Sequence, residues 1–130
     1  MKVGIILKKL TSMVFTIGLG SALLLAGCSS ADSKVSDGVN TMLETTEQLA
    51  KAIDSSDQAK VKEVGPKLEE QWSSFEDDVK KDNKDLYEKI EKYLDPTIAG
   101  SEADTLDKTA LGSLNGQLSD ALKELEKVME

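Results

Sequence analysis

Apolar residues recur along most of the chain at spacings of three and four, which place them on one face of an α-helix. The first such stretch spans residues 33–53, and its helix face consists of Val35, Val39, Met42, Leu43, Thr46, Leu49, Ala50 and Ile53. Ser33 or Ser36 could cap the start of this helix, because a serine hydroxyl accepts a hydrogen bond from a free amide of the first turn. We therefore predict a long amphipathic helix over residues 33–53.

A second helical pattern spans residues 57–81, after a polar break at residues 54–57. Its apolar face consists of Val61, Val64, Leu68, Trp72, Phe75 and Val79. Gly65 and Pro66 lie inside this pattern. Because proline lacks a backbone donor and clashes with the preceding helical turn, we expect a kink or a short break there.

Two further helical patterns complete the chain. The third begins near Lys84 and carries Leu86, Tyr87, Ile90, Tyr93 and Leu94 on one side. Asp95 and Pro96 should end it, since the residue before a proline is disfavoured in helical conformation, and residues 97–102 should be irregular or a single turn. The fourth spans residues 103–128 with a nearly heptad apolar seam, and Gly112 and Gly116 weaken it by about 1 kcal/mol each relative to alanine.

No stretch shows the alternating pattern of a β-strand, so the predicted class is all-α. Short connections favour antiparallel neighbours. We therefore predict a small up-down antiparallel bundle of four amphipathic helices, the third of them short, formed by residues 35–130.

The N-terminal stretch has the plan of a secretory signal peptide. Residues 1–9 carry three lysines, and residues 10–26 form a mostly apolar run without charge. The run ends in Leu-Ala-Gly-Cys, which resembles the lipobox of bacterial lipoproteins. That resemblance implies cleavage between Gly27 and Cys28, a diacylglycerol on the Cys28 thiol and fatty acids such as palmitate.

The resemblance to a lipobox also implies where the protein is localised. Residues 1–27 would be the lipoprotein signal peptide, residues 28–34 the lipidated cysteine and a polar tether, and the domain would sit at the extracytoplasmic face of the cell membrane. An uncleaved membrane helix is the alternative, and it places the domain on the same side, because the positive residues stay inside.

Charge and composition narrow the functional classes. All 24 acidic residues follow Cys28, whereas three of the 16 lysines precede it, so the mature chain carries 13 lysines and a net charge of −11. Such a surface repels nucleic acid and attracts cations or basic partners. The chain has no histidine and no arginine, so the usual general base and the bidentate anion clamp are missing. We therefore expect a protein that is not an enzyme.

The acidic residues offer candidate contacts for a hard cation. Glu88 and Glu91 lie three apart and share a helix face, but a solvated face would look the same, and two such pairs are what this composition gives by chance. A denser group, residues 76–85, falls where the second and third helices should meet. Acids at the C-terminal end of a helix oppose its dipole, so this placement is unexplained by local structure. The candidate metal contacts are Glu76, Asp77, Tyr87, Glu88 and Glu91.

The aromatic and acidic positions of residues 72–91 carry a family resemblance. The order Trp72-x-x-Phe75-Glu76-x-x-Val79-Lys80, followed by Leu86-Tyr87-x-x-Ile90-Glu91, resembles the extracytoplasmic helical domain of bacterial elemental iron uptake systems, found beside the oxidase-dependent iron permease. The resemblance implies a helical bundle outside the membrane that passes or holds iron for a permease.

Two functions are therefore expected. The first is a membrane-anchored lipoprotein accessory to cation uptake, most of all iron, with an iron permease as a partner. The alternative is a non-enzymatic helical interaction module that binds another cell-envelope protein and holds no ligand.

Overall fold

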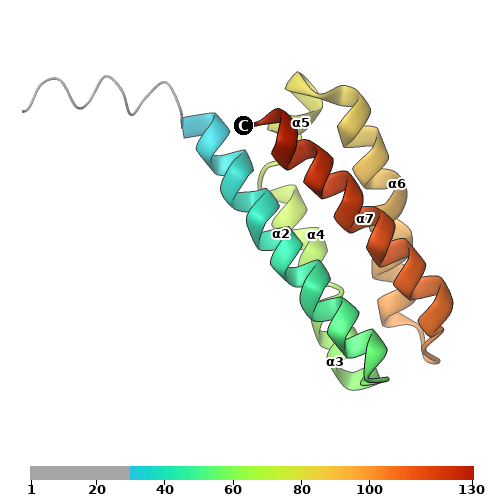
Figure 1. Cartoon of the computed structure of the whole chain (residues 1–130). Helices are drawn as coiled ribbons and strands as arrows, with labels where there is room; N and C mark the ends of the chain where they lie inside the picture. The colour runs from blue at the N-terminus through green and yellow to red at the C-terminus, as the bar shows by residue number, and fades with distance from the viewer. Residues whose placement is uncertain (1–29) are drawn as a thin grey trace, which may run out of the picture. The chain divides into compact units, whose positions relative to one another are not determined.

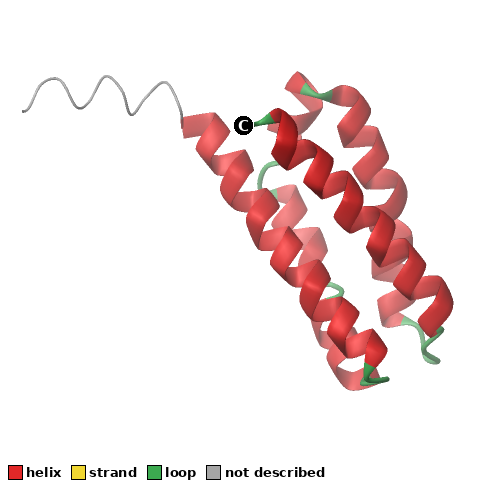
Figure 2. Cartoon of the chain, viewed as in Figure 1, coloured by secondary structure: helices red, strands yellow, loops and turns green. Residues whose placement is uncertain are grey.

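The computed structural model describes residues 30–130, and this part of the chain is a helical bundle without β-strands (Figures 1 and 2). Its helices are α2 (Ser30–Asp54), α3 (Gln58–Val64), α4 (Lys67–Ser73), α5 (Glu76–Asp82), α6 (Lys84–Glu102) and α7 (Lys108–Val128). None of these helices is long and apolar enough to cross a membrane. The predicted signal peptide, Gly27 and Cys28 lie outside the described residues.

Helix α2 follows the prediction closely but begins earlier. Its face toward the core buries Val35, Val39, Met42, Leu49, Ala52 and Ile53. The polar tether was predicted over residues 28–34, and the helix begins at Ser30, three residues before its predicted start at residue 33. Asp32 in the first turn favours this earlier start, because a carboxylate near a helix N-terminus interacts well with the helix dipole.

The predicted second helix is divided into α3, α4 and α5. The first break is at Gly65 and Pro66, where proline was expected to disturb the helix. Both residues keep right-handed helical dihedrals, so the chain continues in nearly the same direction. Gly65 is required here because a Cβ would lie 1.9 Å from the Ser101 hydroxyl of α6. Close contact between α3 and α6 therefore depends on this glycine.

The second break, at Ser74 and Phe75, was not predicted. Phe75 leaves helical geometry, with φ −138° and ψ 1°, and its ring is 1% exposed. The ring lies so close to α2 that a Cβ on Gly38 would be 2.2 Å from Phe75 Cδ1. Burial of the phenyl ring against Gly38 accounts for the break, since an aromatic ring dominates the local burial energy.

Helix α6 corrects the expectation for Pro96. The helix was expected to end at Asp95, but it continues through Pro96 to Glu102. A proline inside a helix costs about 3 kcal/mol, and packing of the helix offsets this cost. Its inner face buries Ile90, Leu94, Thr97 and Ser101 on both sides of the proline.

Helix α7 begins at Lys108, five residues later than predicted, because Asp107 caps it. The Asp107 carboxylate accepts a hydrogen bond of 3.0 Å from the Ala110 amide.

Between α2 and α7, the buried Asn115 side chain donates to the Thr46 carbonyl oxygen at 2.8 Å. The two helices lie side by side in Figure 1, with α6 on the other flank of α7.

Candidate functional site

The predicted metal contacts lie on two neighbouring helices, α5 and α6, which pack against each other. Glu76 and Asp77 are in the first turn of α5, while Tyr87, Glu88 and Glu91 are on α6. The structure brings three of these five residues, Glu76, Tyr87 and Glu91, together around the indole of Trp72. We refer to these four residues as the Trp72 cluster.

Trp72 on α4 organises the cluster. Its side chain is 2% exposed, and its ring stacks on Tyr87 with centroids 5.8 Å apart and meets Phe75 edge-on at 5.3 Å. The indole Nε1–H donates to Glu91 Oε1 at 2.5 Å. A buried indole needs a hydrogen-bond partner, so the interaction fixes one carboxylate oxygen of Glu91 against the aromatic wall.

The carboxyl group of Glu76 faces the same carboxylate. Partial burial raises the pKa of Glu76, and the negative charges of Glu91, Asp77 and Glu69, together with a hydrogen bond to Glu91, raise it further. A neighbouring negative charge disfavours the ionised form of a carboxyl group. The Glu76 carboxyl group therefore keeps its proton to higher pH than a free glutamate does, in the field of the Glu91 charge.

The phenol of Tyr87 lies in the field of this pair. Burial raises the pKa of Tyr87, and the charges of Glu91, Glu76, Asp77 and Asp95 add to the effect. The phenol therefore keeps its proton to higher pH than a free tyrosine does. A bound cation would reverse the local field and make the phenol oxygen a better ligand.

The other two predicted contacts do not join the cluster. Glu88 is exposed and its Oε1 lies 3.8 Å from Lys84 Nζ. Asp77 is exposed and acts on the cluster through its charge. Two carboxylates and a phenol are hard oxygen ligands suited to iron(III) or manganese(II). Within residues 31–130, however, no three side chains among Asp, Glu, His and Cys are placed to hold a metal ion together.

The break at Phe75 also explains the acidic residues that seemed misplaced. Glu76, Asp77 and Asp78 do not end a helix; they form the first turn of α5, and Lys80 and Lys81 lie in its last turn. The three acids in the first turn agree with the helix dipole, and the two lysines in the last turn offset Asp82 at its C-terminal end. The charge at residues 76–78 therefore has a structural reason that is independent of any cation.

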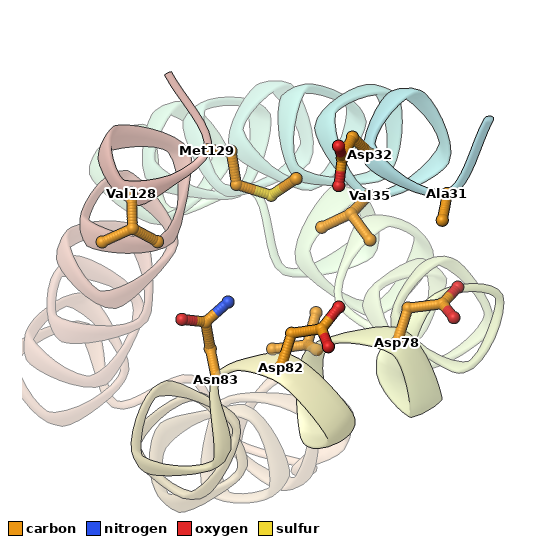
Figure 3. A pocket seen from close by; sticks show the side chains of 9 residues that line it. Ala31, Asp32, Val35, Asp78, Asp82, Asn83, Val128 and Met129 are labelled. Carbon is orange, nitrogen blue, oxygen red and sulfur yellow. The ribbon is translucent and has the colours of Figure 1, made fainter. Parts of the chain in front are cut away.

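Asp82, the last residue of α5, borders a small cavity at one end of the bundle. The cavity has a volume of about 180 Å³ and lies between the start of α2, the end of α5 and the end of α7. Figure 3 shows Asp32, Asp82 and Asn83 around this opening. Asp78, on its edge, lies 3.5 Å from Lys34 Nζ. The sequence missed Asp32 because residues 28–34 were expected to be a tether.

Comparison with known proteins supports the resemblance drawn from residues 72–91. The chain is 31% identical over 96 residues to the iron uptake system component EfeM of Bacillus subtilis (strain 168). The chain is similar to part of an iron uptake component. The aligned stretch covers 71% of this chain and 25% of EfeM, so the chain spans about a quarter of that relative. No family model matches the chain, and no solved structure matches it.

Proposed function

We propose that this protein is an accessory of cation uptake, with iron as the cation, and that it acts as a membrane-anchored lipoprotein at the extracytoplasmic face. The similarity to the iron uptake component EfeM carries this proposal. The Trp72 cluster adds hard oxygen ligands within residues 72–91, which carry the family resemblance.

In this proposal the cation first contacts Glu76 and Glu91. Burial and neighbouring negative charges raise the pKa of Glu76, and a cation bound between the two carboxylates would relieve the repulsion between them. The hydrogen bond from the Trp72 indole holds the Glu91 carboxylate in place while the cation binds. Because few ligands converge, we propose weak and reversible binding, as transfer to a permease requires.

Calorimetric titration of residues 31–130 with iron(III) and with manganese(II) tests the cation contact. We expect saturable binding that Glu76→Gln with Glu91→Gln weakens at least tenfold. The matched control, Glu70→Gln with Glu102→Gln, removes the same charge from exposed positions outside the cluster and should leave the affinity unchanged. Equal weakening by both double variants would reject the cluster as the site.

The membrane anchor is a separate part of the proposal. It rests on the Leu-Ala-Gly-Cys sequence at the end of the apolar run. A lipid on Cys28 would hold the domain close to the membrane surface. Cys28→Ala should accumulate as an unprocessed precursor without acyl label; acyl labelling of that variant, or an uncleaved N-terminus in the natural chain, would contradict the anchor.

We also infer that the domain is an up-down antiparallel four-helix bundle. In this arrangement α3, α4 and α5 follow one another along the bundle and together take the place of its second helix. Contacts at both ends of the domain support this. Lys34 at the start of α2 lies 3.5 Å from Asp78 of α5, and the Gln58 side chain at the start of α3 donates to backbone carbonyl oxygens just after α6. The Lys108 ammonium reaches the Asp54 carbonyl oxygen at 3.1 Å, which joins the end of α2 to the start of α7.

A second candidate function is a non-enzymatic module that binds another envelope protein, such as an iron permease. A groove between α2 and α7 favours this candidate. Both functions are compatible in one protein, because the groove and the Trp72 cluster use different residues.

A further inference from the structure

A long groove follows the line between α2 and α7. It has a volume of about 860 Å³ and is lined by residues within 40–50 of α2 and 112–126 of α7. With a helical rise of about 1.5 Å per residue, these stretches extend over roughly 15 and 21 Å. The groove therefore has the length of a helical segment of about ten to fourteen residues.

Glycines on α7 leave the groove without side chains at two successive turns. A Cβ at Gly116 would meet no atom within 4 Å, and one at Gly112 would meet only Ile53 Cγ2 at 4.0 Å. Gly38 and Gly65 differ, since their missing side chains make room for Phe75 and Ser101. Glycine destabilises a helix relative to alanine, and packing within residues 31–130 gives no reason for it at position 116.

A buried amide on the floor of the groove points independently to an occupant. Asn115 is 3% exposed, and its Nδ2 donates to the Thr46 carbonyl oxygen at 2.8 Å. Its Oδ1 is buried and accepts no hydrogen bond. An unsatisfied buried acceptor is unfavourable, and Asn115 lines the groove. Because this oxygen has no exposed surface, the Asn115 amide must turn toward the groove before a donor from an occupant can satisfy it.

The charge of the groove selects the occupant. Its charged residues are Glu44, Glu47, Asp120, Lys123 and Glu126, so its net charge is −3. Lys51 lies 3.0 Å from Glu47, but both side chains are more than two-thirds exposed, and such a pair is weak and readily exchanged. A second copy of this chain, with its own excess of acids, would add like charge. A segment with lysine or arginine is complementary.

We propose that the groove between α2 and α7 binds an amphipathic helix of another protein. A stripe of small or apolar residues on that helix packs against Gly112 and Gly116, lysines or arginines on its flanks meet Glu44, Glu47 and Asp120, and a polar hydrogen donates to Asn115 Oδ1. Helix-in-groove recognition of this kind reads anchors spaced by three and four residues. The inference does not depend on cation binding.

Calorimetry with a defined probe tests the groove on the full chain in detergent. The probe is a synthetic amphipathic helix of about fourteen residues, long enough for the groove, with an alanine–leucine stripe flanked by lysines. Its matched control carries glutamates in place of the lysines. We expect saturable binding of the lysine peptide and at least tenfold weaker binding of the glutamate peptide.

Variants locate the binding. The leucine side chain of Gly116→Leu projects into open space, so the variant should retain the helical content of the natural chain. It should weaken binding of the lysine peptide at least tenfold, because the side chain fills the groove. Glu44→Lys with Glu47→Lys should weaken binding of the lysine peptide to a similar extent. The control, Glu70→Lys with Glu102→Lys, makes the same charge change outside the groove. Its affinity for the lysine peptide should stay within twofold of that of the natural chain.

Three results would overturn the proposal. The first is no saturable binding of the lysine peptide. The second is equal loss in the groove variants and the control, which would indicate nonspecific charge attraction. The third is a dimer of the chain in ultracentrifugation that Gly116→Leu abolishes, which would make a second copy the occupant.

Discussion

The indole nitrogen of Trp72 on α4 donates to a carboxylate oxygen of Glu91 on α6, nineteen residues further along the chain. Removing this donor should destabilise the domain. In Trp72→Phe a smaller aromatic ring takes the place of the indole and Glu91 loses its donor, and a hydrogen bond to a charged group contributes about 1.5–3 kcal/mol. Because Glu91 is only half-buried, we expect a loss of about 1–2 kcal/mol, measured by urea unfolding with circular dichroism. Glu91→Gln retains an acceptor and should lose less; an equal or larger loss would contradict the role of the hydrogen bond.

The pKa of Glu76 gives the domain a pH dependence. The pKa is raised in the folded chain above its ordinary value of 4.5, so the folded state binds more protons than the unfolded state between these two values. The contribution of Glu76 to stability is therefore complete below pH 4.5 and is lost as the pH rises through the raised value.

Replacing Glu76 by Gln should remove this dependence. We expect Glu76→Gln to be more stable than the natural chain at neutral pH by a few tenths of a kcal/mol, since the side chain is partly exposed, and equally stable at pH 4. Thermal unfolding from pH 4 to 8 measures both. A steeper fall in stability with pH for the variant would contradict the pairing with Glu91.

The phenol of Tyr87 should ionise at higher pH than free tyrosine. Burial and the charges of Glu91, Glu76 and nearby acids raise its pKa. In a Tyr93→Phe background, ultraviolet titration follows Tyr87 alone, since the chain has two tyrosines. Adding Glu91→Gln should shift the midpoint downward, because one of the raising charges is removed. An unchanged midpoint would show that Glu91 does not act on the phenol.

The contact between Gly65 and Ser101 predicts a rescue. Gly65→Ala places a Cβ 1.9 Å from the Ser101 hydroxyl oxygen and 2.2 Å from its Cβ, and overpacking of this kind costs typically about 1–3 kcal/mol. Ser101→Gly removes both atoms, so the double variant should be more stable than the sum of the single changes. Ser101→Ala keeps the Cβ and should restore little. Additive losses in chemical unfolding would show that the two positions are not in contact.

The apolar periodicity predicted the helical class and most of the core, because burial of one helix face is a local property of the sequence. It placed Val35, Val39, Met42, Leu49 and Ile53 of α2 correctly in the interior. The break at Phe75 has no local signal, since it arises from a ring that packs against Gly38, far away in the sequence. Pro96 shows the reverse case, in which a strong local signal is outweighed by packing on both sides of it.

The candidate site was predicted only in part for the same reason. Glu76, Tyr87 and Glu91 were chosen for their chemistry, and the fold brings them together. Their link through Trp72 joins α4 to α6. Because α5 and a break on each side of it separate these two helices in the sequence, no helical spacing rule predicts the contact. Glu88, one turn from Glu91, illustrates the limit of spacing alone, because it faces Lys84.

Trp72 is the only tryptophan of the chain, and its indole touches both the acid and the phenol of the cluster. Its fluorescence is therefore an intrinsic reporter of the site. Replacement of Glu91, arrival of a cation or loss of the stacking with Tyr87 would each change the surroundings of this single emitter. The state of the cluster can thus be followed in the unlabelled protein.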